Sequence, residues 1–322
     1  MSLLEVKNLK TVFNTPYGKV KAVNDVSFSI NEGEVVGIVG ESGSGKSVTS
    51  LSIMNLISKP HGIIENGQII FEGMDLLKLS DKEMCKVRGN NISMVFQEPM
   101  TSLNPVFTIE NQIGEVLKLH KNCNKQDIHE RVIKVLKDLK IPNPQEVMKK
   151  YPFELSGGMR QRIVIAMAIV CTPKIIIADE PTTALDVTTQ DEILCLLKNI
   201  TESINSSVML ITHDLGVIAE MATKVIVMYR GKIVEQCDVV EFFDNAKHPY
   251  SQGLINSMPN NFTKNGRFHC IKGNVPSMHE EIKGCAFCER CYRAMKICKE
   301  KEPPIKKIRQ GHTVSCWLEQ EV

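Results

Sequence analysis

The sequence lacks three features that would each direct it to a particular class of protein. It has no large excess of one charge, since 39 lysine and arginine residues face 37 aspartate and glutamate residues and the net charge is +2. A broad basic surface for nucleic acid is therefore not expected. It has no apolar run long enough to cross a bilayer, and residues 1–7 do not begin a secretory signal peptide. We expect a cytosolic chain whose action at a membrane would depend on separate membrane subunits.

Cysteine is present but unevenly distributed. Six of the 11 cysteines lie beyond residue 269. In a cytosolic chain they are not expected to form a disulfide framework. The 322 residues suffice for one large domain with an appendage, or for two domains.

A glycine-rich segment follows the apolar run at residues 35–39. Residues 40–47 read Gly-Glu-Ser-Gly-Ser-Gly-Lys-Ser, which fits the pattern G-x-x-x-x-G-K-[ST] between a predicted strand and a predicted helix at 48–57. The glycines let consecutive backbone N–H groups and the helix N-terminus point at one phosphate group. The pattern predicts that the lysine reaches the β- and γ-phosphates and that the last serine binds Mg²⁺. The predicted nucleotide contacts are Gly40, Ser42, Gly43, Gly45, Lys46, Ser47 and Val48.

A small antiparallel sheet is predicted ahead of this segment. Residues 3–12 and 20–30 alternate apolar and polar side chains, which is typical of half-buried strands. The turn between them carries Tyr17, whose ring is suited to stack on adenine. An ordinary turn tyrosine and Phe13 are the alternatives.

Three buried strands are predicted to end in polar side chains, at the sheet edge where open α/β proteins bind ligands. Gln97 follows the first and is suited to contact Mg²⁺ or to position water, although a surface glutamine fits the same pattern. Asp179 and Glu180 follow the second, suited respectively to anchor Mg²⁺ and to polarise the attacking water. His213 follows the third and suits a γ-phosphate contact, with a satisfied surface or core histidine as the alternative.

A helical insertion is predicted over residues 108–150, where the apolar residues take helical spacing. Residues 155–162 then read Leu-Ser-Gly-Gly-Met-Arg-Gln-Arg and open an apolar helix. A serine and two glycines at a helix start indicate a second anion-binding terminus, while a capped helix with a flexible entry is the alternative. Residues 224–229 and 232–235 predict a final hairpin.

In order and separation, these segments resemble the nucleotide-binding subunit of an ATP-binding cassette (ABC) transporter over most of residues 1–260. The resemblance implies an α/β fold of the P-loop NTPase (RecA-like) class. It would have a mostly parallel sheet core, an antiparallel β edge sheet, a helical subdomain at about residues 105–165 and a small cysteine-rich C-terminal region. Residues 1–250 would form the ATPase domain and residues 251–322 the C-terminal region. The resemblance favours Tyr17 over Phe13, because Tyr17 lies at the family's distance before Lys46.

The resemblance also implies a mechanism in which two such domains close head to tail around ATP. Ser156, Gly157 and Gly158 would contact the ATP of a second ABC ATPase subunit, expected to be a related but different chain. Asp186 matches the family's dimer-contact loop. Met159 stands where the commonest signature has glutamine, so the contribution of that side chain across the interface is absent.

The same resemblance assigns this chain's own ATP to residues of the other motifs. The implied catalytic residues are Glu180, His213 and Gln97. The implied Mg²⁺ ligands are Ser47, Gln97 and Asp179. Closure around ATP would drive the membrane subunits, and hydrolysis would reset them.

A narrower resemblance is to the subgroup that powers uptake of dipeptides, oligopeptides and nickel. It rests on Val-Phe-Gln-Glu-Pro at 95–99, Ser-Leu-Asn-Pro at 102–105, Tyr-Pro-Phe-Glu at 151–154 and His-Pro-Tyr at 248–250. This implies an importer ATPase at the cytoplasmic face of the membrane, with two transmembrane permease subunits and an extracytoplasmic substrate-binding protein.

Peptide is the expected cargo, and nickel or a metal chelate is the alternative, because other subunits choose the cargo. A soluble ABC ATPase of DNA repair or translation is the alternative of another class. It predicts tandem cassettes, a coiled-coil insertion or a basic surface, which this sequence does not show.

The C-terminal cysteines extend the narrower resemblance. Cys285, Cys291, Cys298 and Cys316 match the positions that in some members ligate a [4Fe-4S] cluster, and Cys288 is additional. Four thiolates in a short, poorly hydrophobic segment are also typical of a metal site on chemical grounds. Zinc fits the same S₄ ligation, and reduced cysteines packed in a small lobe are the remaining alternative.

Overall fold

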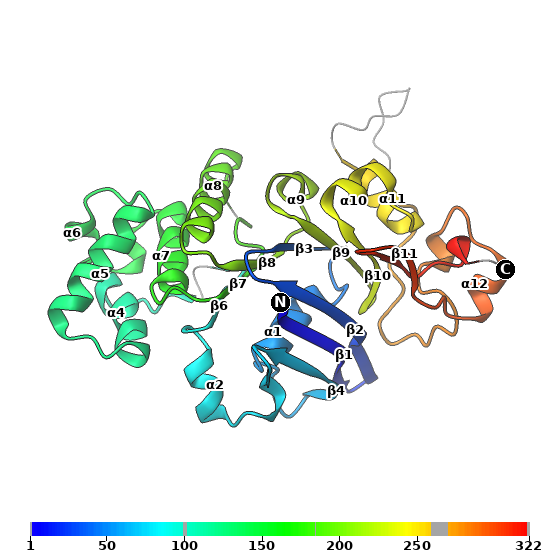
Figure 1. The fold of residues 1–322 in the computed structure, drawn as a ribbon, viewed down its shortest axis with the longest axis horizontal. Coiled ribbons are helices and arrows are strands. Elements are labelled where there is room, and N and C mark those ends of the chain that lie inside the picture. Colours follow the sequence, from blue (N-terminus) through cyan, green and yellow to red (C-terminus); the bar gives the residue numbers. More distant parts are fainter. Residues whose placement is uncertain (1, 99–101, 184, 259–269, 321–322) are drawn as a thin grey trace. The chain divides into compact units, whose positions relative to one another are not determined.

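The computed structural model describes residues 2–98, 102–183, 185–258 and 270–320. Pro99, the last residue of one subgroup motif, lies outside the described residues, as does His269 beside the first C-terminal cysteine. The chain divides into two compact units, one of residues 31–34 and 78–210 and the other of residues 2–30, 35–77 and 211–322. Figure 1 follows the elements of both along the chain.

The second unit begins with the expected antiparallel edge sheet. Its strand order is β2 (Gly18–Asn31), β1 (Ser2–Thr15), β4 (Gly62–Phe71) and β5 (Met74–Asp75). β1 pairs with β4 and β4 with β5, both antiparallel. The alternation of apolar and polar residues that predicted β2 matches the burial of its side chains, since Val26, Phe28 and Ile30 are buried. The turn of Pro16 and Tyr17 joins β1 to β2.

The same unit holds the strand that precedes the glycine loop, β3 (Val35–Val39), parallel to β9 (Lys224–Tyr229). The predicted final hairpin is confirmed, although its second strand, β10 (Lys232–Asp238), is longer than expected. β10 also pairs with β12 (His312–Val314), which forms a C-terminal hairpin with β11 (Lys306–Arg309); sequence patterns did not predict this hairpin. The C-terminal region therefore extends the sheet that carries the glycine loop.

Helix α1 (Lys46–Ile53) begins two residues earlier and ends four residues earlier than predicted. Gly45 takes a left-handed conformation at its N-cap, so the loop turns directly into the helix. The other helices of this unit are α9 (Leu215–Met221), α10 (Val239–Asn245), α11 (Pro249–Asn256) and α12 (Lys296–Glu300). Short 3₁₀ turns span Leu76–Lys78, Cys288–Arg290 and Trp317–Glu319.

The first unit carries the predicted helical insertion. Its elements are α2 (Asp81–Val87), β6 (Ile92–Val95), α4 (Ile109–His120), α5 (Lys125–Asp138), α6 (Pro144–Val147), a 3₁₀ turn (Pro152–Glu154), α7 (Gly157–Ile169), β7 (Ile175–Asp179), α8 (Val187–Ser203) and β8 (Ser207–Ile211).

Helices α4, α5 and α7 pack against one another (Figure 1). Thr108 and Asn124 cap α4 and α5 through side-chain oxygens. β8, β7 and β6 lie in that order, and β6 runs parallel to β7. Across the residues that the structure describes, no helix combines the length and the apolar character needed to cross a bilayer.

Candidate nucleotide site

The glycine loop has the backbone geometry of a phosphate cradle. Gly40, Gly43 and Gly45 have φ of 151°, 76° and 100°, a region that side chains disfavour. A Cβ on Gly40 would lie 2.2 Å from the Met228 carbonyl oxygen, and one on Gly45 would lie 2.4 Å from that of Ala22. At Gly43 nothing lies within 4 Å of the position that a Cβ would take. The loop is thus packed tightly at its ends and open at its middle, as an anion-binding concavity requires.

Lys46 is buried inside this loop. Its side chain is 6% exposed, and Nζ donates hydrogen bonds to the carbonyl oxygens of Gly40 at 2.8 Å and Glu41 at 3.0 Å. Ser44 Oγ lies 3.4 Å from the same nitrogen. The ammonium group is therefore held within the loop, where its positive charge would attract a bound phosphate. Ser42 and Ser47 are exposed and Val48 is half-buried.

The loop is also fixed from outside. The backbone N–H of Glu41 donates to Tyr250 Oη at 2.8 Å, and Tyr250 is fully buried. The neighbouring His248 accepts from the Tyr250 N–H through Nδ1 at 3.0 Å, and burial lowers the pKa of His248 to about 3. Neutral imidazole is the form that can accept this bond. The His-Pro-Tyr phrase therefore has a local structural role behind the loop.

Glu180 follows β7 and is held by two hydrogen bonds. Its Oε2 accepts from Gln97 Nε2 at 2.9 Å and from Thr183 Oγ1 at 2.8 Å. Its φ of 47° is uncommon for a residue with a side chain. Asp179, the residue before it, is 5% exposed. The first unit thus brings Gln97 and Glu180 into direct contact.

Sequence reasoning did not single out Thr183. The signal for it was available, because a hydroxyl residue three positions after a strand-end carboxylate can turn back onto that carboxylate. Both hydrogen bonds reach the same carboxylate oxygen of Glu180, Oε2.

Tyr17 and His213 belong to the second unit. Tyr17 is 87% exposed, and its ring meets that of His279 edge-on at 6.2 Å between centroids. Phe13 is half-buried, and its ring would lie 2.8 Å from a Cβ built on Gly62. Tyr17 is therefore the more available of the two aromatic candidates. His213 is exposed directly after the buried Thr212.

The signature segment opens α7 as a capped helix. Ser156 Oγ accepts from the Met159 N–H at 3.3 Å, and Gly157 is exposed beside it. A Cβ on Gly158 would lie 2.7 Å from Thr189 Cγ2, so the start of α7 approaches α8 closely. A cavity of about 430 Å³ lies along the segment and is lined by Ser156 to Met159, Arg162, Leu185, Asp186 and Thr189, among others.

Asp186 is the N-cap residue of α8, and it lines the same cavity as the signature segment. Its carboxylate accepts from the Thr189 backbone N–H at 3.0 Å and from the Thr189 hydroxyl at 2.7 Å. These hydrogen bonds hold the pKa of Asp186 below its usual value. The signature and this turn therefore present charge, a helix N-terminus and small residues along one open surface.

The C-terminal cysteines form a small lobe joined by backbone hydrogen bonds. The Cys285 N–H donates to the Cys298 carbonyl at 2.8 Å, and the Cys288 N–H donates to that of Cys285 at 3.0 Å. Cys298 and Cys316 are buried, whereas Cys291 is half-buried. Burial raises the pKa of Cys285 to about 12 and that of Cys316 to about 11, and nearby thiols add to the effect.

The spacing of these thiols bears on which metal they fit. Tetrahedral zinc with Zn–S bonds of about 2.3 Å would hold four sulfurs about 3.8 Å apart. Glu235, Cys237 and His312 form a group in which three potential metal-ligating atoms all lie within 4.8 Å of one another. Among the described residues, the cysteines of the lobe belong to no such group. A four-iron cluster holds its thiolates farther apart than zinc does, because each thiolate binds a different iron.

The Glu235 group is a buried hydrogen-bonded cluster that sequence reasoning missed. His312 Nε2 lies 2.8 Å from Glu235 Oε1, and both side chains are buried. Glu235 also accepts from the backbone N–H groups of Lys247 at 2.6 Å and His248 at 3.0 Å. Glu241 lies 3.4 Å from His312 Nδ1. These bonds join the C-terminal hairpin to the segment that supports the glycine loop.

Comparison with known proteins confirms the predicted family. The model of a family described as ABC transporter matches residues 23–183, and that of a family described as oligopeptide/dipeptide transporter, C-terminal region, matches residues 234–298. The oligopeptide transport ATP-binding protein AppD of Bacillus subtilis (strain 168) is 48% identical, over 99% of this chain and 98% of that protein. The dipeptide transport ATP-binding protein DppD of the same organism is 47% identical, over 99% and 95% respectively.

A solved structure supports the same assignment. The dimeric post-hydrolysis state of the ATP-binding cassette MJ0796, bound to ADP and Pi, is 29% identical with a TM-score of 0.66, over 73% of this chain and 98% of that chain. The predicted α/β fold of an ABC cassette is thereby confirmed. The chain belongs to the ATP-hydrolysing, ATP-binding subunits of ABC transporters, in the group that carries the oligopeptide/dipeptide transporter C-terminal region.

Proposed function

We propose that this chain hydrolyses ATP to power the import of di- or oligopeptides. The proposal is carried by two arrangements in the same chain: a glycine loop that holds a buried lysine, and a strand-end glutamate held by Gln97 and Thr183. The peptide cargo is supported by the names of the full-length relatives, which are oligopeptide and dipeptide transport ATP-binding proteins. Import of nickel or a metal chelate is the competing cargo.

The phosphate loop binds the triphosphate in this proposal. Its backbone N–H groups and Lys46 receive the negative charge, and Tyr17 stacks on the adenine. Mg²⁺, when bound, neutralises charge on the β- and γ-phosphates, and Ser47, Gln97 and Asp179 are its proposed ligands. Oxygen donors of this kind suit Mg²⁺, which binds through few protein groups.

Glu180 acts on the water that attacks the γ-phosphate. Its Oε2 is engaged by Gln97 and Thr183, so the carboxylate is held in one orientation. A carboxylate held in this way can accept a proton from, or orient, the attacking water. His213 is proposed to contact the γ-phosphate from the end of β8, at a turn whose Asp214 caps α9.

The signature serves a second nucleotide. Ser156, Gly157 and Gly158 present the N-terminus of α7 beside an open cavity, a surface suited to an anion brought by another subunit. The proposed partners are a second, related ABC ATPase subunit, two transmembrane permease subunits and an extracytoplasmic substrate-binding protein. The chain would thus act peripherally at the cytoplasmic face of the cell membrane.

Cys285, Cys291, Cys298 and Cys316 are proposed to hold a [4Fe-4S] cluster, with zinc as the alternative. Support comes from their shared lobe, in which burial and neighbouring thiols raise the pKa of Cys285 and of Cys316. Any such group would be structural or regulatory, because the proposed ATP chemistry uses other residues.

The test is uptake in a strain that lacks this chain alone, rescued with wild type or with Lys46→Ala. Loss of labelled di- and oligopeptide uptake, restored by wild type and not by the variant, is the expected result. Loss of nickel uptake with normal peptide uptake would mean that the cargo is nickel and not peptide. Normal uptake of both would contradict a transport role.

A further inference from the structure

A salt bridge joins the cysteine lobe to the phosphate loop. Arg290 Nη1 lies 2.5 Å from Glu41 Oε2, and Nη2 lies 2.9 Å from Glu41 Oε1. Both oxygens of one carboxylate therefore meet the guanidinium fork, which is the strongest geometry for such a pair. Glu41 is the second residue of the glycine loop, and Arg290 lies 249 positions away, in the 3₁₀ turn Cys288–Arg290.

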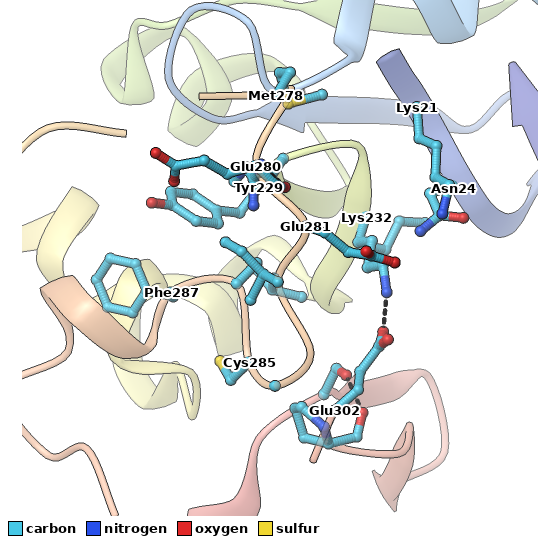
Figure 2. Close-up of a pocket in the computed structure, with 18 of the residues that line it drawn as sticks. Lys21, Asn24, Tyr229, Lys232, Met278, Glu280, Glu281, Cys285, Phe287 and Glu302 are labelled. Atoms are coloured by element: carbon cyan, nitrogen blue, oxygen red, sulfur yellow. Dashed lines mark hydrogen bonds and ion pairs between the residues drawn. The ribbon is translucent and has the colours of Figure 1, made fainter. Parts of the chain in front are cut away.

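The arginine is held rigidly on the side of the lobe. Its side chain is 5% exposed, and Nη1 also donates to Tyr229 Oη at 3.3 Å. Its Cζ lies 5.9 Å from the ring centroids of both Tyr229 and Phe287, within the range of cation–π attraction. The rings of Tyr229, Tyr250 and Phe287 pack against one another, with centroids 4.7 to 5.3 Å apart. Figure 2 shows Tyr229 and Phe287 on neighbouring segments beside Cys285.

Without a partner, the negative charge of Glu41 would be unfavourable in a loop that binds a triphosphate. The Glu41 side chain is 30% exposed, and the residue follows the first glycine of the loop. An unpaired carboxylate there would repel the incoming anion. Its backbone, by contrast, is structural, since the carbonyl accepts from Lys46 Nζ and the N–H donates to Tyr250. The loop thus needs the Glu41 backbone in place and the Glu41 charge neutralised.

We propose that Arg290 is a positioning residue for ATP binding: it neutralises the Glu41 carboxylate and turns it toward the cysteine lobe, away from the phosphates. The inference rests on the glycine loop being the ATP site, as proposed above. It assigns the lobe a direct effect on nucleotide affinity, whatever group the cysteines hold. Conversely, a change in the turn between Cys288 and Cys291 would reach the loop through the Arg290 side chain.

The experiment measures equilibrium ATP binding to the purified full chain without magnesium, so that hydrolysis does not interfere. Arg290→Gln should raise the Kd for ATP about tenfold, which corresponds to the coupling expected of a close charge pair. Arg290→Gln combined with Glu41→Gln should return the Kd to within about threefold of wild type, because the unpaired charge is gone. Lys232→Gln is the matched control: it breaks the ion pair with Glu302, which also joins β10 to the C-terminal region (Figure 2), and should leave the Kd unchanged.

Two results would overturn the inference. One is wild-type affinity in Arg290→Gln. The other is a double variant as weak as Arg290→Gln, since the loss would then come from disturbed packing of the lobe and not from the carboxylate. Lys46→Ala distinguishes a failure of the Arg290 inference from a failure of the assignment of the glycine loop as the ATP site. Weak ATP binding by that variant with normal binding by Arg290→Gln removes Arg290 alone, whereas normal binding by Lys46→Ala removes the loop assignment and the inference together.

Discussion

Gln97 and Glu180, which end two neighbouring parallel strands, are joined by a hydrogen bond of 2.9 Å from the amide Nε2 to the carboxylate Oε2. The amide donates and the carboxylate oxygen accepts, so the bond fixes the orientation of the Glu180 side chain. A carboxylate held in one orientation can position a water for attack. The contact couples a residue suited to magnesium with the residue suited to hydrolysis.

Glu180→Gln tests the role of that carboxylate. The amide keeps the size of the side chain but loses the negative charge and the basic oxygen. We expect kcat for ATP hydrolysis to fall by about 10²- to 10⁴-fold, with ATP still bound and an ATP-dependent dimer accumulating. ATPase assays and size-exclusion chromatography with ATP would measure both. Glu130→Gln on the exposed face of α5 is the control, and wild-type turnover in Glu180→Gln would remove Glu180 as the catalytic group.

Thr183→Val tests the second hydrogen bond to Glu180. Valine has nearly the shape of threonine but cannot donate the 2.8 Å bond to Oε2. Loss of one such bond is worth about 0.5–1.5 kcal/mol, so kcat should fall about 2-fold to 13-fold. Because the residue acts through Glu180, KM for ATP should stay the same. Thr183→Ser should recover most of the rate, and equal loss in both variants would argue against the hydrogen bond.

The buried pair of Glu235 and His312 should control the stability of the C-terminal hairpin. His312→Ala removes the side-chain hydrogen-bond partner of the buried Glu235, which is expected to lower the free energy of unfolding by about 1–3 kcal/mol. Chemical denaturation would measure it. Lys307→Ala, at an exposed position of the same hairpin, is the control. Similar losses in the two variants would mean that the hairpin as a whole, and not the pair, is responsible.

The lobe thiols predict how the metal-free chain responds to pH. The pKa of Cys285 is raised to about 12 and that of Cys316 to about 11, above the value of about 8.5 for an unfolded thiol. Above a pH of about 8.5, the folded chain keeps more thiol protons than the unfolded chain. The contribution of these thiols to the free energy of unfolding is therefore fully present at neutral pH and falls as the pH rises toward 11 and 12. Denaturation of chelator-treated protein from pH 7 to 10.5 would measure this. Stability that is constant or rising over that range would contradict the burial of these thiols.

The same thiols predict the response to metal. Ligation requires thiolates, so binding should release protons and become tighter as pH rises. Anoxically purified protein should contain iron and be brown. Cys298→Ser should lose the metal, whereas Cys195→Ser, at an exposed position on α8, should keep it. Stoichiometric zinc without iron would move the assignment to zinc, and metal-free wild-type protein would leave a packed cysteine lobe.

Much of the fold was predictable, because its signals are local. The alternation in β1 and β2, the helical spacing of α4 and α5, and the apolar strands β6, β7 and β8 each arise from burial of one face or of both faces of an element. Helices α2, α8, α9, α10, α11 and α12 were not predicted. Nor was the C-terminal hairpin, whose strand β11 carries three cationic residues and little apolar alternation.

The sequence by itself determined the phosphate loop, the polar strand ends and the family, since these depend on glycine conformation and on residue types within a few positions of one another. Only the tertiary structure decided which distant side chains meet. Arg290 reaches Glu41 across 249 positions, and His312 reaches Glu235 across 77. The physical reason is that such pairs are set by the pairing of β10 with β12 and by the packing of aromatic rings, which the whole chain must fold to create.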